Sequence, residues 1–162
     1  MPVWQQVYEE LNDPDFVLIC VAEDTGGEAV AGPIFDAVEP TYIQVIDENH
    51  TVSTAFNWIN VPSAAWIDEE GRIVRIDEGT YAKVHEMGEG DQAITFGTDV
   101  YAPAVKDWVK NGAASRFVQS VETVAGHIRQ QTEDRGRAEA AFRLGNFFRQ
   151  FGQQALTERY WD

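Results

Sequence analysis

Residues 60–74 read NVPSAAWIDEEGRIV, and this stretch decides the expected fold. Ser63 to Ile67 is a short apolar run that predicts a strand. The turn DEEG follows, in which Gly71 is free to adopt the positive φ that tight hairpin loops need. Residues 72–76 then alternate between polar and apolar side chains, as expected for an antiparallel edge strand. The stretch therefore predicts a β-hairpin that directly follows Val61-Pro62.

Upstream of this hairpin, helices and strands alternate. Residues 3–11 carry apolar side chains at helical spacing. Residues 16–22, FVLICVA, are a continuous apolar run that predicts a strand buried on both faces. We expect a helix at 28–38, a strand at 41–46 and a short helix at 50–58. Strands separated by helices imply parallel pairing with right-handed crossovers.

Downstream, residues 77–103 contain five Gly or Pro and no strong periodicity. We expect a long loop there, with one short strand near 93–96. Beyond it the pattern is helical, with helices expected near 104–110, 114–131 and 136–152.

The charge is unevenly distributed. Residues 1–100 contain 20 acidic and 3 basic side chains, a balance of −17, whereas residues 101–162 contain 7 acidic and 9 basic ones, a balance of +2. This change indicates a domain over 1–100 followed by a helical tail over 101–162. The acidic half would repel phosphate backbones, so no nucleic-acid partner is expected. A halophile-type surface is the alternative explanation of the acidic excess.

Several classes of protein find no support in the sequence. There is no 18-residue apolar run, so no membrane span is expected, and no signal peptide is recognisable, which leaves the cytoplasm as the default compartment. Motifs of zinc proteases, serine hydrolases and P-loop proteins are missing, and the three histidines are widely spaced. We interpret the acidic run 68–70 as a solvated hairpin turn rather than a metal site, and we expect no metal and no cofactor.

Cys20 is the single cysteine. One cysteine cannot form an internal disulfide, a Cys-x-x-Cys redox pair or a cysteine-based zinc site. Its place in the middle of the apolar run 16–22 predicts burial, which raises the pKa of a thiol and blocks access to it. We interpret Cys20 as structural filler rather than a redox group, and we expect no catalytic residue in this chain.

The order of elements and the stretch 60–74 resemble the thioredoxin superfamily, in particular the TlpA-like and AhpC/TSA-type redoxins, whose matching stretch reads Gly-Val-Pro-Thr…Ile-Asp…Gly-Arg-Ile. The resemblance covers residues 2–76. It implies an α/β thioredoxin-like three-layer fold, incomplete at its N-terminus, with C-terminal α-helices. It also implies a Trp-Cys-x-x-Cys segment before Met1, which would make Met1 an internal methionine or a fragment boundary. The implied partner is a thiol or disulfide protein substrate.

The resemblance places a substrate-binding site at Val61 and Pro62. It implies a cis Val61-Pro62 bond that faces the N-terminal end of helix 3–11, with the Val61 backbone paired to an extended substrate peptide. The alternative is an ordinary trans proline that opens an edge strand. Trp58 and Trp66 flank the site, and we favour core packing over a place in a substrate groove for both.

The same resemblance predicts a defect in the sheet. In the family, the strand that precedes the cysteine helix lies between the strands expected here at 16–22 and 63–67. Without it, two unpaired strand edges would remain. Either the segment 93–96 fills the position, or a partner chain inserts a strand, or the isolated chain is only marginally folded. We favour the last two, and self-association through an unpaired sheet edge is the corresponding partner expectation.

The C-terminus has a resemblance of its own. Leu144-Gly145, Phe148, Gly152 and Trp161 follow the spacing of the tetratricopeptide pattern, so residues 136–162 resemble a truncated repeat, with plain core packing as the alternative.

Two functions remain open at this point. The first is part of a thiol-disulfide oxidoreductase or thiol peroxidase whose catalytic cysteines are not in this chain. The second is a redox-inactive thioredoxin-fold module that binds peptides or partner proteins. We favour the first.

Overall fold

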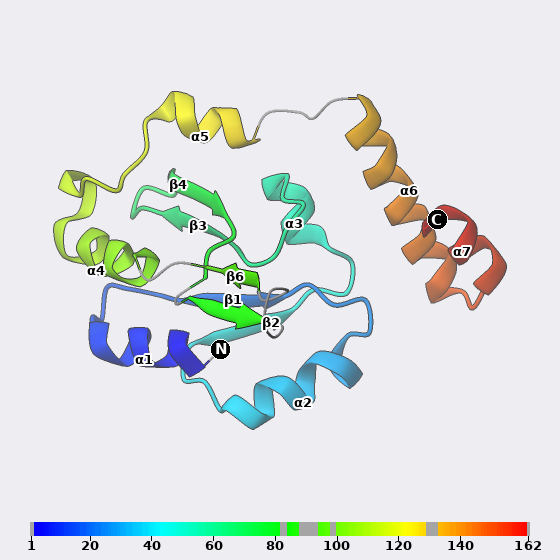
Figure 1. The fold of residues 1–162 in the computed structure, drawn as a ribbon, viewed down its shortest axis with the longest axis horizontal. Coiled ribbons are helices and arrows are strands. Elements are labelled where there is room, and N and C mark those ends of the chain that lie inside the picture. The colour runs from blue at the N-terminus through cyan, green and yellow to red at the C-terminus, as the bar shows by residue number, and fades with distance from the viewer. Residues whose placement is uncertain (1, 82–83, 88–93, 98–99, 129–132, 162) are drawn as a thin grey trace.

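The computed structural model describes residues 2–81, 84–87, 94–97, 100–128 and 133–161. These residues form a mixed α/β structure with three separate two-stranded sheets (Figure 1). In chain order the elements are α1 (Pro2–Leu11), β1 (Ile19–Ala22), α2 (Glu28–Val38), β2 (Ile43–Ile46), α3 (Thr51–Phe56), β3 (Ser63–Ile67), β4 (Ile73–Glu78), β5 (His85–Met87), β6 (Ile94–Phe96), α4 (Tyr101–Asn111), a 3-10 turn (Gly112–Ala114), α5 (Val121–Ile128), α6 (Glu133–Gln150) and α7 (Gln154–Trp161).

The first sheet is a parallel pair. Ile19 of β1 lies opposite Ile43 of β2, and α2 connects the two strands, which confirms the expected strand–helix–strand unit. The expectation of a strand buried on both faces over 16–22 is wrong, because β1 begins only at Ile19 and the Ile19 side chain is 55% exposed. The physical reason is that one face of the β1–β2 pair is not covered, since Ile43 and Val45 on the same face are exposed as well.

The second sheet is the expected hairpin. β3 spans the predicted residues, and β4 extends to Glu78, two residues further than expected. The strands are antiparallel, with Trp66 opposite Arg75 and a bulge between Trp66 and Ile67. Gly71 in the connecting turn has a φ of 77°, which confirms the predicted positive value.

The main buried cluster joins this hairpin to α4. Trp66 is 4% exposed, its ring stacks on Trp108 with 5.0 Å between centroids, and its Nε1 donates a hydrogen bond of 2.9 Å to the Tyr101 hydroxyl. Trp4 of α1 and Phe16 pack against the same cluster. The core thus contains residues from both sides of position 100, while the division into 1–100 and 101–162 stays a prediction.

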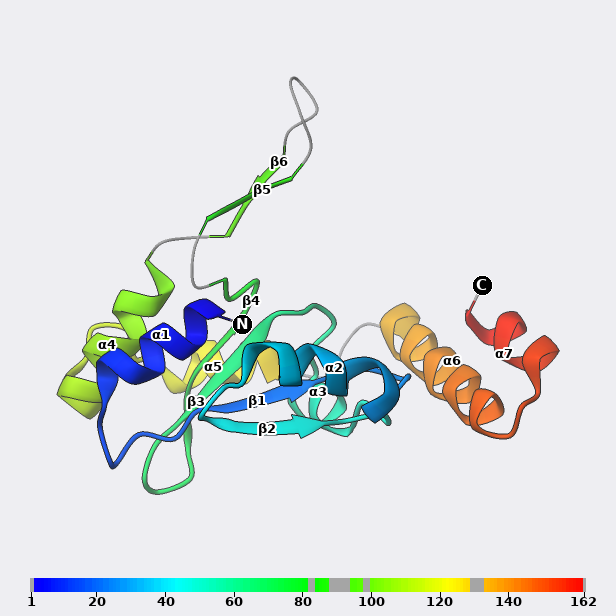
Figure 2. The same ribbon diagram turned by 90° about the horizontal axis from the view of Figure 1, so that it is seen from below.

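The segment 77–103 holds more structure than expected. Instead of one short strand, it contains the antiparallel pair β5–β6, with Glu86 opposite Thr95. Neither strand pairs with β1 or β3, and Figure 2 shows the pair extending away from the other two sheets. Residue 93 of the expected strand lies outside the described residues. The remedy in which a local strand completes the sheet is therefore wrong, because β6 pairs with β5.

The C-terminal helices form a helical hairpin, α6 and α7. A Cβ added to Gly145 of α6 would overlap the indole of Trp161 on α7, so this close approach requires glycine. Gly152 turns the chain between the helices with a φ of 66°. The helix expected at 114–131 is shorter than predicted, since α5 starts at Val121, and residues 129–131 lie outside the described residues. The tetratricopeptide resemblance stays a prediction.

Candidate functional site

The Val61-Pro62 bond is cis, as expected from the sequence. The Val61 side chain projects into solvent and is 73% exposed. The Pro62 carbonyl accepts a hydrogen bond of 2.9 Å from the Thr80 N–H, which lies just beyond β4. The amide of Asn60 donates to the carboxylate of Glu78 at 2.7 Å. The residues on either side of Val61 are thus attached to the β4 end, while no residue that the structure describes bonds to Val61 itself.

The predicted proximity of Pro62 to α1 stays a prediction. The contacts of α1 run elsewhere: Trp4 meets the Tyr101 ring of α4 edge to face at 6.0 Å, and the Gln5 amide bonds to the backbone and hydroxyl of Thr41 before β2.

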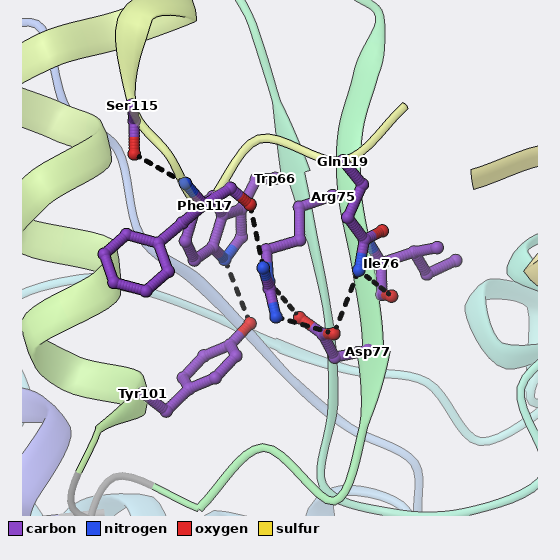
Figure 3. A network of polar contacts seen from close by, with 8 residues as sticks. All are labelled: Trp66, Arg75, Ile76, Asp77, Tyr101, Ser115, Phe117 and Gln119. Carbon is purple, nitrogen blue, oxygen red and sulfur yellow. Dashed lines mark hydrogen bonds and ion pairs between the residues drawn. The ribbon is translucent and has the colours of Figure 1, made fainter. Parts of the chain in front are cut away.

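The outer edge of the hairpin, on β4, is covered by a side chain (Figure 3). The Ile76 N–H donates to Gln119 Oε1 at 3.0 Å, and Gln119 Nε2 donates back to the Ile76 carbonyl at 3.3 Å. The Gln119 N–H also donates to the Val74 carbonyl at 2.9 Å. The amide of Gln119 therefore bonds to β4 much as the backbone of a neighbouring strand would.

The bonds to Gln119 show which backbone groups of β3 point away from β4, at the inner edge of the hairpin. Because Val74 and Ile76 point their backbone groups outward, Arg75 and Asp77 point theirs toward β3, where they lie opposite Trp66 and Ala64. The alternate β3 residues Ser63 and Ala65 then have their N–H and C=O on the side away from β4. Val61 precedes β3 and the cis bond, and no described residue bonds to its backbone.

β1 has a matching unpaired row. The carbonyls of Leu18 and Ala22 accept hydrogen bonds from Ile43 and Asp47, so these even-numbered residues face β2. Ile19 and Val21 consequently point their N–H and C=O to the other side. We call the row Ser63 and Ala65 on β3 and the row Ile19 and Val21 on β1 the open edges.

The two open edges belong to strands of different sheets. In Figure 1, β3 lies on the side of β1 away from β2 and runs in the opposite direction. Phe16, just before β1, packs against the cluster that contains Trp66 near the end of β3, which agrees with this opposite direction. The site thus consists of two strands, β1 and β3, that run in opposite directions and are each paired on one side only.

The chain matches no known family model, no curated protein and no solved structure. The functional interpretation therefore depends on the geometry of the site and on the sequence resemblance. Within the described ranges, no helix combines the length and the apolar character needed to cross a membrane.

Cys20 lies in the middle of β1, as expected, and is only half-buried. Burial raises the pKa of its thiol above the ordinary value, which disfavours the reactive thiolate. Nearby, burial and then the neighbouring Cys20 raise the pKa of Tyr42 to about 12. These environments do not activate a nucleophile.

The two tryptophans that flank the site have different surroundings. Trp66 is buried in the main cluster, with the Arg75 guanidinium 5.2 Å from its ring, so the expectation of core packing is confirmed for it. Burial, and then the charge of Asp77, raise the pKa of the Tyr101 hydroxyl that bonds to Trp66. Trp58 stacks on Phe56 with 4.6 Å between ring centroids, and core packing of Trp58 stays a prediction.

The acidic turn after β3 is held by its own chain. Asp68 accepts hydrogen bonds from the N–H groups of Glu70 and Arg72, and the Arg72 side chain lowers the pKa of the Asp68 carboxyl. Within the described residues, no three potential metal ligands come together, here or elsewhere.

One polar cluster was not anticipated from the sequence. The Glu23 carboxylate, just after β1, accepts hydrogen bonds from the N–H and hydroxyl of Ser53 and pairs with His50 Nδ1 at 2.9 Å. Phe142 of α6 covers the His50 ring edge to face at 4.9 Å. A shallow cavity of about 330 Å³ lies here, lined by Glu23, Asp24, Thr25, His50, Phe142 and Trp161. A histidine and an acid after adjacent parallel strands were the signal available in the sequence.

Proposed function

We propose that this chain is part of a thioredoxin-fold redoxin, of the thiol-disulfide oxidoreductase or thiol peroxidase type, whose catalytic cysteines are not in this chain. Its own contribution is to bind an extended segment of a thiol or disulfide protein through the backbone of Val61. The observation that carries the proposal is Val61, just before β3, whose side chain is exposed and whose backbone no described residue bonds. Pairing with an exposed strand edge is a common way to bind extended peptides.

The order of elements also supports the thioredoxin-like assignment. A helix, a parallel strand–helix–strand unit, a short helix and an antiparallel hairpin follow one another as the resemblance requires. Val61 lies at the junction between α3 and the hairpin, where the family would bind its substrate.

A pair of substitutions separates backbone pairing from side-chain contact at Val61. Val61→Pro removes the N–H, whereas Val61→Ala keeps it and removes most of the side chain. With S-carboxymethylated insulin B chain as the unfolded probe, amide shift titration should report changes at Val61 and Ser63. We expect about tenfold weaker binding for Val61→Pro and near-parental binding for Val61→Ala, with the circular dichroism of both variants unchanged. Equal losses in both variants would contradict backbone pairing.

The second candidate is a redox-inactive peptide-binding module. It is favoured by the single, half-buried Cys20, whose thiol pKa is raised. Two-thiol chemistry needs a resolving partner, so we expect no insulin reduction or peroxide turnover by this chain. Activity that survives Cys20→Ser would contradict this reading of the chemistry. Adding a Trp-Cys-x-x-Cys peptide in trans distinguishes the candidates, since only the redoxin should gain turnover from it.

A further inference from the structure

We propose that the shallow cavity beside His50 binds an organic cation, a guanidinium or ammonium group carried on an apolar chain. We call it the acidic–aromatic cavity, and its lining consists of Glu23, Asp24, Thr25, His50, Phe142 and Trp161. The cavity shares no lining residue with the Val61 site and requires no redox chemistry, so cation binding here goes beyond the proposed function.

Segments far apart in the chain build this cavity. Glu23 follows β1 and His50 follows β2, so the two side chains meet where the parallel strands end. Both ribbon views place α6 beyond these strand ends (Figure 1 and Figure 2). The Phe142 ring of α6 covers the His50 ring, and the Gln150 amide of the same helix donates to Asn49 Oδ1 at 2.7 Å. These two contacts hold α6 beside the strand ends and close one side of the cavity.

The polar atoms of the lining are acceptors that lack donors. Asp24 Oδ1 accepts the Gly26 N–H at 2.7 Å, and no described residue bonds to the other oxygen of this carboxylate. His50 Nδ1 lies 2.9 Å from Glu23, so a neutral imidazole donates from Nδ1 and presents Nε2 as an acceptor. In the part of the chain that the structure describes, Nε2 is buried without a hydrogen-bond partner. A ligand with several N–H donors would satisfy both acceptors once the half-exposed Phe142 ring turns away from Nε2.

The charge of the lining selects a cation. Glu23 and Asp24 supply two carboxylates, and no Lys or Arg of the described residues pairs with either one. Residues 1–100 have a charge balance of −17, so the surrounding field also attracts cations. A metal ion does not fit, because no three potential metal ligands come together within the described ranges.

Two aromatic rings favour an organic cation with an apolar chain. Phe142 and Trp161 stack with 6.5 Å between centroids, and 38% and 45% of their surfaces are exposed. Exposed aromatic faces attract guanidinium and ammonium groups, and they also cover alkyl chains. Gly145 lets Trp161 approach, since a Cβ at this position would overlap the indole. The volume of about 330 Å³ suits a group of this size.

The first test measures binding to the full chain, labelled with ¹⁵N, by amide shift titration. The probe is butylguanidinium, and N-butylurea is the control of the same shape without charge. We expect shifts at Asp24, Thr25 and His50, and binding of the probe at least about fivefold tighter than that of the control. Equal binding of N-butylurea would overturn the proposal, as would shifts confined to residues outside the cavity.

The guanidinium group has two sources, a free small molecule or an arginine of a partner protein. Acetyl-Gly-Arg-Gly-amide carries the same group on a peptide. Binding of this peptide as tight as that of butylguanidinium would support the site and indicate a partner arginine. Binding of butylguanidinium alone would support the site and indicate a free small molecule.

The second test compares two variants with the same change of charge. Asp24→Asn keeps the oxygen that accepts from Gly26 but loses the charge, and it should weaken butylguanidinium binding at least about fivefold. Asp36→Asn removes an exposed charge of α2 outside the cavity and should leave the affinity unchanged. Circular dichroism checks that both variants fold. Equal losses in the two variants would overturn the proposal, because the field of the whole protein would then hold the cation.

Discussion

The two edges of the β3–β4 hairpin are treated in opposite ways. On the outer edge, one glutamine amide bonds to both backbone groups of Ile76, and the Arg75 guanidinium reaches the Phe117 carbonyl at 2.8 Å. On the inner edge, no described residue bonds to the backbones of Val61, Ser63 and Ala65. A sheet edge left bare invites another strand. The comparison shows that a side chain covers one edge of the hairpin, while the other edge keeps backbone groups that no described residue bonds.

The largest expected effect comes from removing the hairpin from its core. Trp66→Ala should lower the free energy of unfolding by about 3–5 kcal/mol, because a buried aromatic and its stacking on Trp108 are lost. Both edges of the β3–β4 hairpin would then become less ordered together. Urea denaturation measures the change. The half-exposed Trp161 provides the control, and an equal loss in Trp161→Ala would show that Trp66 does not anchor the hairpin.

A smaller effect is expected from uncovering the outer edge. Gln119→Ala removes the acceptor of the Ile76 N–H, and Ile76 is only 1% exposed. A buried unsatisfied group costs about 1–3 kcal/mol. In Gln119→Ala, the Ile76 amide should exchange its hydrogen as fast as the Ala65 amide does. The outer edge would then be as unprotected as the inner edge. Gln154→Ala, which removes only a surface bond to Glu158, should change neither stability nor exchange.

The smallest effect concerns the parallel pair rather than the hairpin. Folding raises the pKa of Tyr42 to about 12 through burial, so the folded state holds this proton more tightly than the unfolded state. Between about pH 10 and 12 the free energy of unfolding should therefore fall as pH rises. Tyr42→Phe should reduce that slope without abolishing it, because the pKa of Tyr101 is raised as well. An unchanged slope in Tyr42→Phe, measured by urea titration at several pH values, would contradict this assignment.

The sequence was informative where a local pattern decides the structure. The apolar run at 63–67, the DEEG turn and the Pro-containing junction predicted the hairpin, and the alternation of helices and strands predicted the parallel pair. The exposure of Ile19 could not be read from FVLICVA, because burial depends on neighbours that the run itself does not specify. The sheet defect was expected only from the family resemblance and stays a prediction, and the structure has β1–β2 and β3–β4 as separate sheets.

Local sequence patterns could not predict contacts between residues that are far apart in the chain. Gln119 bonds to a residue 43 positions earlier, and no periodicity in residues 114–120 distinguishes it from a solvent-exposed glutamine. The pairing of His50 with Glu23 was missed for a related reason, since each residue looked isolated in the sequence. It becomes visible only when the two are placed after adjacent parallel strands.

The bond between Gln119 and Ile76 has a consequence for how this chain tolerates mutation. A strand that covers an edge is spread over many codons, and no single nucleotide change removes it. Here the two bonds to Ile76 come from one side chain, and most single-nucleotide changes in a glutamine codon produce a residue, such as lysine, glutamate or leucine, that cannot both donate to and accept from a backbone. A single mutation at position 119 would therefore leave the N–H and C=O of Ile76 open to pairing with another strand.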